Sequence, residues 1–448
     1  MRTAIHRVLL VIVASCLACG ISLSYAQTTP LADVSTFDNF HTSDYEALLA
    51  GALSAMENGR LTEARQGISD ALQVIKVNHG LLSPEQFPAL QLLAAASLEQ
   101  LDLETFDQHL AYFEWLLRKL SVSDFDAYLA GTEILTSLYL DAAAIADNPN
   151  NAHYLVAAKQ LNWRAVSAIE IRYGKENLDL APWLYNIVLT HYYQSELTRR
   201  KGITSYDYKS TTPEVVSGWS LTKNESLEQS YSIGFELLLR IRTLYANSTK
   251  ASPLTDALML TYLADWELIF NRTDAALDLY NTAYEMVRAA DTDIATLESW
   301  FARPVIIPPT SFSDSWPQTR SSADTTINFV AWSSVFPGVH RPELLVALTR
   351  RTISKYSATA NFDLSFNNSG SAAEPTDDFE HISCSVSKLR IDEFSPHNDL
   401  VASLAQHQIS ALHFRPLLLD GKPVSGSNFR LNYVFPTETD FSMISDAK

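Results

Sequence analysis

The chain has 448 residues, more than one hydrophobic core usually serves, so we expect two or three domains of ~100 to 200 residues each. Hydrophobic residues make up 47% of it and its mean hydropathy is −0.03, which predicts folded, soluble domains, and its 14 Gly and 18 Pro are too few for a fibrous or largely disordered chain. The 51 acidic residues outnumber the 33 basic ones, and a net charge of −18 repels phosphate backbones, so nucleic acid is not an expected partner.

The N-terminus has the pattern of a secretory signal. Arg2 and Arg7 precede an apolar, uncharged run from Val8 to Leu23, and Ser24-Tyr25-Ala26 places small residues at the positions that signal peptidases require. We therefore predict a signal peptide over residues 1–26 that is cleaved after Ala26. The apolar run is shorter than the ~20 residues of a spanning helix. No later segment is long and apolar enough to span either, so we expect no membrane span in the mature form.

The mature protein is expected to hold a single thiol. The cysteines are Cys16, Cys19 and Cys384, and the first two leave with the signal peptide, so no internal disulfide can form. Cys384 alternates with Ile382 and Val386, which predicts a small core residue on a strand rather than a nucleophile. A second interpretation remains open, in which Cys16 or Cys19 ends a loose lipoprotein processing site and becomes a lipid anchor.

From residue 44 to about 290, apolar residues recur at i, i+3, i+4 and i+7, the pattern of helices. A Ser-Pro pair at Ser83 and again at Ser252 provides the cap and the first-turn proline with which two helices begin. We expect five helix pairs, over residues 44–78, 84–120, 124–173, 179–247 and 253–290.

A spacing of small residues repeats within these helices. The offsets 0, 7, 12, 16 and 19 are shared by Ala52, Gly59, Ala64, Ile68 and Ala71 and by Ala264, Asn271, Ala276, Tyr280 and Ala283. This spacing resembles the tetratricopeptide repeat, in which small residues let two helices approach closely and Gly or Asn turns the chain between them. A looser copy has Leu101 at the turn and Phe106 in place of a small residue, so we expect that pair to pack wider.

The fourth pair contains an insertion. Between Thr198 and Glu225 the sequence is polar and rich in turn residues, and it opens with the basic run Arg199-Arg200-Lys201. We interpret it as a surface loop, because long connections are tolerated cheaply. The alternative is an ordered insertion that shapes a groove on the concave face of the array. In either case the basic run is a candidate for steering an anionic partner.

Strand periodicity replaces helical periodicity near the C-terminus. Prolines between residues 304 and 317 predict a linker over residues 303–353. The elements expected after it are strands over 356–366, 382–386, 417–419 and 429–435 and a helix over 398–411, with Asp420-Gly421 as the tight turn of the last hairpin. The order of these elements, two strands, a helix and two more strands, predicts a small antiparallel sheet that is covered by one helix.

Phe414-Arg415-Pro416 follows the predicted helix, and Asp420-Gly421-Lys422-Pro423-Val424 follows a short apolar run. This order resembles the C-terminal domain of the TonB family, over about residues 354–435. The resemblance implies a periplasmic bacterial protein whose C-terminal domain docks a component of the cell envelope. The chain departs from the family at Leu412, where an aromatic residue is common. It also has a predicted signal peptide and a helical array where energy-coupling members have a spanning anchor and a Pro-rich spacer.

Residues that carry chemistry are sparse. The histidines near the C-terminus are His381, His397, His407 and His413. They lack a metal-binding spacing, so we interpret them as surface or hydrogen-bonded side chains and expect no metal and no cofactor. The sequence contains no phosphate-binding loop, nucleophile elbow or zinc-protease helix, so we do not expect an enzyme. Arg415 and Lys422 are candidate exposed contacts to a partner; alternatively, Arg415 satisfies carbonyls at the helix end and Lys422 occupies a turn.

The leading hypothesis is a periplasmic binding or scaffold protein, in which the helical array recognises a protein or peptide and the TonB-like domain docks another envelope component. Recognition is expected either by strand addition at the free edge of the C-terminal sheet or by an extended peptide that lies in the helical array. The alternative is an accessory, energy-transducing component of TonB-dependent outer-membrane transport. Some aromatic residues of the array are candidates for lining a groove, although we expect most in the core: Tyr112, Phe113, Trp115, Trp183, Tyr185, Tyr192 and Tyr193.

The predicted domain order is a signal peptide at 1–26, an N-terminal extension at 27–43, a tetratricopeptide-like helical repeat domain at 44–302, a Pro-containing linker at 303–353, a TonB-like α+β domain at 354–436 and a C-terminal tail at 437–448.

Overall fold

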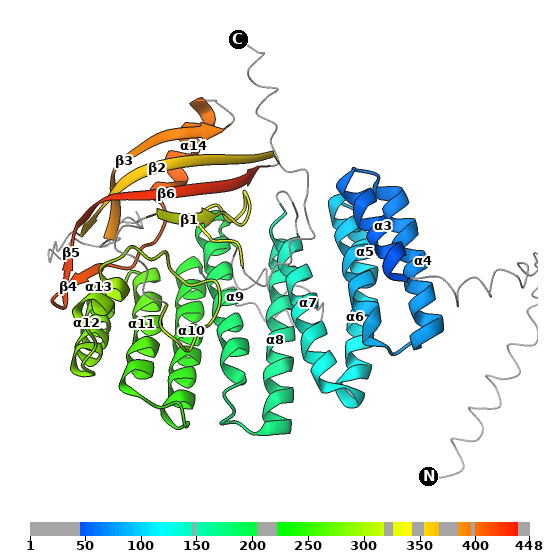
Figure 1. The fold of residues 1–448 in the computed structure, drawn as a ribbon, viewed down its shortest axis with the longest axis horizontal. Coiled ribbons are helices and arrows are strands. Elements are labelled where there is room, and N and C mark those ends of the chain that lie inside the picture. Colours follow the sequence, from blue (N-terminus) through cyan, green and yellow to red (C-terminus); the bar gives the residue numbers. More distant parts are fainter. Residues whose placement is uncertain are drawn as a thin grey trace, which may run out of the picture.

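The computed structural model describes residues 45–145, 148, 150–203, 222–317, 326–342, 354–366, 384–395 and 399–437. Within these ranges the chain is mostly helical, with a small mixed sheet near the C-terminus (Figure 1). The predicted signal peptide, the N-terminal extension and the tail after Thr437 lie outside the described residues, as do Cys16, Cys19, His381 and His397.

The helices lie side by side as successive pairs, and their bounds agree with the five pairs that the apolar periodicity predicts (Figure 1). The pairs are α3 (Tyr45–Glu57) with α4 (Leu61–His79), α5 (Phe87–Glu99) with α6 (Leu103–Ser123), α7 (Phe125–Ala143) with α8 (Asn151–Tyr173), α9 (Leu180–Lys201) with α10 (Lys223–Ala246), and α11 (Pro253–Ile269) with α12 (Thr273–Ala289). A 3-10 turn, η1 (Pro84–Gln86), precedes α5, and the short helix α13 (Ile294–Phe301) follows α12. No helix in the described part of the chain combines the length and the apolar character of a membrane span.

Three of the helix pairs share one turn. Gly59, Leu101 and Asn271 join α3 to α4, α5 to α6 and α11 to α12, with φ values of 72°, 57° and 61°. After each, the next amide donates to the carbonyl five residues before it, at 2.8, 3.0 and 2.9 Å. This left-handed turn closes a helix C-terminus and reverses the chain. The spacing read from the sequence therefore marks a repeated structural feature.

The C-terminal sheet has the strand order β1 (Thr326–Val330), β6 (Gly426–Thr437), β2 (Ser354–Phe366) and β3 (Cys384–Ser395). Helix α14 (Asp399–Ser410) packs against β3 and β2. β6 runs antiparallel to β2 but parallel to β1, so the prediction of a purely antiparallel sheet is wrong. β1 comes from the segment predicted as a linker, and its five residues are too few for alternation to be recognised.

The predicted last hairpin is wrong in its second arm. Asp420 and Gly421 both have positive φ, 50° and 71°, as an Asp-Gly tight turn requires. The strand that returns from them is β5 (Lys422–Val424), which pairs with β4 (Leu417–Leu419) in a separate two-stranded sheet. Residues 429–435 lie instead in β6, which pairs with β2 in the centre of the main sheet and buries alternate side chains.

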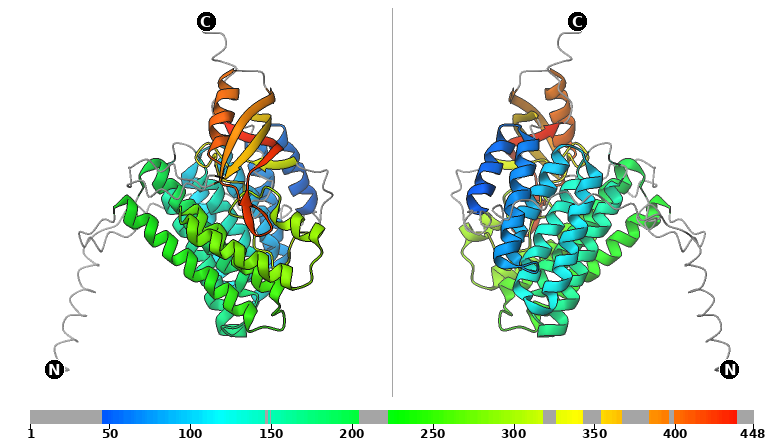
Figure 2. Two further views of the ribbon diagram at one scale, coloured as in Figure 1. Left: turned by 90° about the vertical axis from the view of Figure 1, so that its left-hand side faces the viewer. Right: turned by 90° about the vertical axis from the view of Figure 1, so that its right-hand side faces the viewer.

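The sheet lies on one side of the helical array, over its C-terminal half, in all three views (Figures 1 and 2). One core cluster fills the array and a second fills the sheet and α14. The helical cluster also contains Ile307, Trp332, Phe336 and Leu418, which belong to the C-terminal part of the chain. The array and the sheet are therefore joined by buried apolar contacts.

Candidate functional site

Residues 303–317, which we call the strap, belong to the predicted linker and lie against the helices α9 and α11. Tyr185 of α9 donates its hydroxyl to the carbonyl of Pro309, at 2.8 Å. The hydroxyl of Tyr262, on α11, accepts the amide of Ser313 at 2.9 Å. The strap thus crosses both helices and is held by its backbone.

Aromatic ring contacts add to these hydrogen bonds. The ring of Phe312 lies 5.9, 5.8 and 5.5 Å from the rings of Tyr185, Tyr245 and Tyr262. Trp316 of the strap also donates its ring N–H to the carbonyl of Leu254, at 2.9 Å. Each aromatic pair contributes ~0.5–1.5 kcal/mol beyond the area it buries. The inner surface of this half of the array therefore binds an irregular segment of its own chain that carries aromatic side chains.

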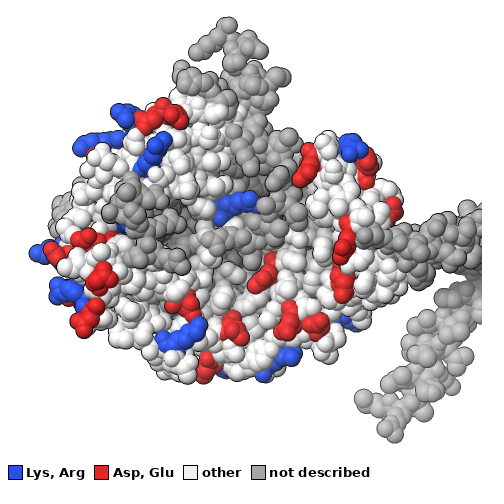
Figure 3. All heavy atoms as spheres, viewed as in Figure 1, with Lys and Arg blue, Asp and Glu red and all other residues white. Residues whose placement is uncertain are grey.

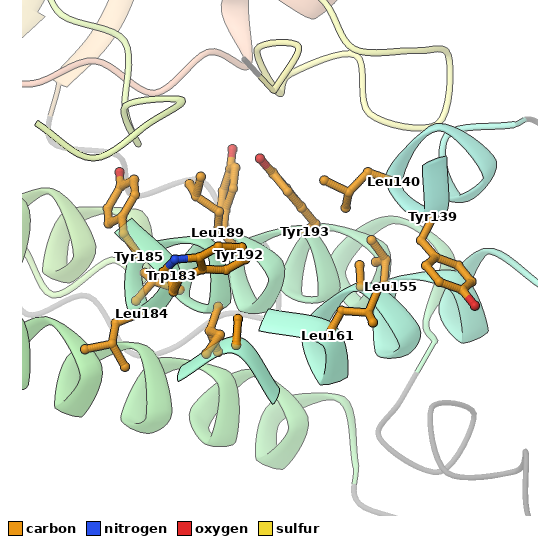
Figure 4. Packing of buried hydrophobic residues seen from close by; sticks show 14 of the residues in the cluster. Tyr139, Leu140, Leu155, Leu161, Trp183, Leu184, Tyr185, Leu189, Tyr192 and Tyr193 are labelled. Carbon is orange, nitrogen blue, oxygen red and sulfur yellow. The ribbon is translucent and has the colours of Figure 1, made fainter. Parts of the chain in front are cut away.

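A second segment, residues 331–342, covers more of α9. Trp332 and Phe336 lie 4.8 and 6.2 Å from the ring of Tyr193. Tyr185 and Tyr193 rise from α9 toward the overlying chain, whereas Trp183 and Leu184 are directed away from it (Figure 4). Most aromatic residues considered for a groove are buried, namely Phe113, Trp183, Tyr185, Tyr192 and Tyr193.

Arg415 is buried, so the prediction of an exposed contact at this residue is wrong. Its guanidinium donates to both carboxylate oxygens of Asp265 on α11, at 2.9 and 2.6 Å, and the two side chains are 9% and 3% exposed. Tyr280 donates to the same carboxylate at 2.5 Å. The partner lies 150 residues away in sequence, so local pattern cannot find it. The sequence signal for this ion pair was the acidic Asp265 within the apolar α11.

Lys422, the other predicted contact, is exposed on β5.

The basic run at the end of α9 shares one buried carboxylate. Arg199 and Arg200 both bind the carboxylate of Glu196, at 2.6 and 3.3 Å, and Glu196 is 7% exposed. One carboxylate offsets one of the two positive charges, so the anion-steering role of the run stays a prediction. Lys201 is exposed, and residues 204–221 of the insertion lie outside the described ranges.

The first helix pairs have an open groove of about 630 Å³, which we call the N-terminal groove. It is lined by Tyr45, Glu46, Leu49, Ala50 and Leu53 of α3, Pro84, Glu85, Phe87 and Pro88 of η1 and α5, and Ile134 of α7. Its lining is mostly apolar with two carboxylates, and it is wide and open to solvent, unlike the enclosed clefts that bury most of a small ligand.

The repeat register shows how the two halves correspond. Ala52 and Ala264 hold the same place in their helix pairs, so residues at equal distances from them face the same way. Leu53 follows Ala52 as Asp265 follows Ala264, and Asp265 binds Arg415. Ala50 precedes Ala52 by two residues as Tyr262 precedes Ala264, and Tyr262 binds the strap. The N-terminal groove is thus the open counterpart of a surface that the chain itself covers at the other end.

Titratable side chains form no metal centre in the described ranges, where no group of three or more His, Cys, Asp or Glu is placed to hold an ion. His413 is partly buried, and its Nδ1 has no hydrogen-bond partner in the described part of the chain. His191 of α9 is 5% exposed, and burial, with a smaller effect of Lys159, lowers its pKa to about 3. Cys384 is a core residue, as predicted, and burial raises its pKa to about 12.

No family model matches the chain, and no curated protein matches it either. The structure defines a mostly helical protein with a small mixed sheet seated on its C-terminal half. The tetratricopeptide and TonB resemblances stay predictions.

Proposed function

We propose that this protein is a periplasmic binding or scaffold protein of the bacterial cell envelope. It recognises a protein or peptide through the N-terminal groove of a tetratricopeptide-like array, and its TonB-like C-terminal domain docks another envelope component. The observation that best supports the proposal is the strap, an irregular segment without helix or strand that is held on α9 and α11 by tyrosine hydroxyls and ring contacts. The equivalent surface at the other end of the array carries no such segment among the described residues.

Peptide recognition on this surface has a physical basis. The groove is built on helices packed into a large common core, so its lining side chains are held in place before a partner arrives. Preorganisation of this kind lowers the entropy lost on binding. Stacked helix pairs present extended inner surfaces that suit a chain without secondary structure of its own.

The edge strand β3 is a less favourable docking place. Register shifts interrupt its pairing with β2, Lys388 has a φ of 47°, and the Lys388 and Arg390 side chains are 83% and 76% exposed. Bulges and charges on an edge strand oppose the addition of another strand. We therefore place the principal site in the N-terminal groove. The energy-transducing alternative requires a membrane anchor, which cleavage after Ala26 removes.

Site-directed crosslinking in intact cells tests the proposal. A photo-reactive residue at Leu53, in the groove, should capture one or a few discrete envelope proteins. The same residue at Val122, which is 92% exposed on α6, is the matched control and should not capture them. N-terminal sequencing of the exported chain should begin at Gln27. Identical capture at both positions, or none at Leu53, contradicts a binding role for the groove.

A further inference from the structure

The N-terminal groove has an apolar floor and an acidic rim. Leu49, Leu53 and Ile134 are half-buried and supply apolar surface, whereas Glu46 and Glu85 are exposed at its edge. Among the described residues that line it there is no Lys or Arg. An occupant therefore meets apolar side chains and two carboxylates, with no cation from the array in the lining.

The surrounding helices extend this negative charge. Residues 45–145 carry 14 acidic and five basic side chains, a net charge of −9, which is half of the −18 of the whole chain. Acidic side chains gather over α3 to α7 on the face shown in Figure 3. A field of one sign attracts partners of the opposite sign and disfavours a second copy of the same acidic chain.

The covered half of the array shows which side chains its inner surface accepts. There the chain supplies a cation, Arg415, and an aromatic ring, Phe312. At the open end Leu53 replaces the acid that binds Arg415, so a cation in the N-terminal groove pairs with the rim carboxylates rather than with the floor. The apolar floor is left for aromatic or aliphatic side chains of the occupant.

We propose that the occupant of the N-terminal groove is an extended segment of a partner protein that combines aromatic or aliphatic side chains with Lys or Arg. This inference rests on the proposed function, because it names the chemistry of the partner for the same groove. Apolar contacts supply most of the affinity, and the cationic side chains supply selectivity and faster association.

Selection of random peptides of about 15 residues, displayed on phage, against the full-length protein provides the test. Selected peptides should carry net positive charge and at least one aromatic or branched aliphatic residue. The variant Ala50→Trp fills the groove from an exposed helix position and should weaken their binding by roughly tenfold or more. The matched control Ile171→Trp, at a position that is 87% exposed on α8, should leave binding unchanged.

A second pair of variants isolates the charge. Neutralising the rim with Glu46→Gln and Glu85→Gln together should weaken the binding of a cationic peptide roughly fivefold. The dependence of that binding on salt concentration should not become steeper. Peptides that are blocked by Ala50→Trp but are neutral or acidic would overturn the inference and leave the proposed function standing. A selection that yields no peptide sensitive to Ala50→Trp would overturn both. Self-association that Ala50→Trp abolishes would assign the groove to a second copy of the chain and overturn the inference.

Discussion

At the residue scale, the most consequential contact is the buried ion pair of Arg415 and Asp265. Arg415→Met leaves the carboxylate buried without its cation, so we expect the free energy of unfolding to fall by about 3–5 kcal/mol in urea denaturation at pH 7. Lys422→Ala, nearby in sequence but exposed, is the control and should change it by less than ~0.5 kcal/mol. Similar losses in the two variants would show that Arg415 is not held as the structure describes.

His191 gives stability a pH dependence whose sign follows from its burial. Its pKa is about 3 in the folded protein and 6.5 as the ordinary value, so between these pH values the unfolded chain binds the extra proton. The stabilisation is complete above pH 6.5 and is lost as the pH falls. From pH 7 to pH 5 this group alone should cost about 2 kcal/mol. Denaturant unfolding at both pH values should show that His191→Gln reduces the loss by that amount, and an unchanged loss would contradict the assignment.

At the element scale, the contact of α10 with α11 depends on a glycine. Gly234 lies against the ring of Trp266, and a Cβ there overlaps the indole. Trp266 is 1% exposed and cannot move away, so Gly234→Ala should cost ~1–3 kcal/mol. Gly51→Ala, on α3 with open space around its Cα, should instead stabilise by ~0.5–1 kcal/mol. Thermal unfolding followed by circular dichroism should show shifts of opposite sign. Shifts of the same sign would contradict the helix contact.

Local signals in the sequence predict the helical elements well. Ser83 and Ser252 accept hydrogen bonds from the backbone at the helix starts where they were expected, and Gly59 and Asn271 make the turns. The C-terminal elements are predicted less well because their pairing is non-local. β1 is identified by its partner β6, about 100 residues later, rather than by its own five residues. The same holds for the candidate site. The repeat spacing in the sequence marks equivalent positions in the first and last helix pairs, but only the structure shows which of these positions the chain itself covers.

At the scale of the whole molecule, three separate contacts join the array to the sheet region. The strap pairs with the C-terminal segment through the amide of Arg415, which donates to Val305 at 2.8 Å. Arg415 reaches into α11, and the turn at Gly421 lies against Tyr284 of α12. Because these contacts involve the strap and both helices of the last pair, the sheet region is attached to the array at several separate points.

These shared contacts predict that the helices and the sheet unfold together. In a chain with Cys16→Ser and Cys19→Ser, Cys384 is the remaining thiol and is 2% exposed, so its reaction with a chromogenic thiol reagent reports opening of the sheet. Far-UV circular dichroism reports the helices, and the two urea midpoints should coincide. Arg415→Met should separate them, with the thiol reacting at the lower urea concentration, because the sheet loses its buried anchor on α11. If the thiol of the chain with Arg415 intact reacted well below the helical transition, the array and the sheet would be independent domains that merely touch.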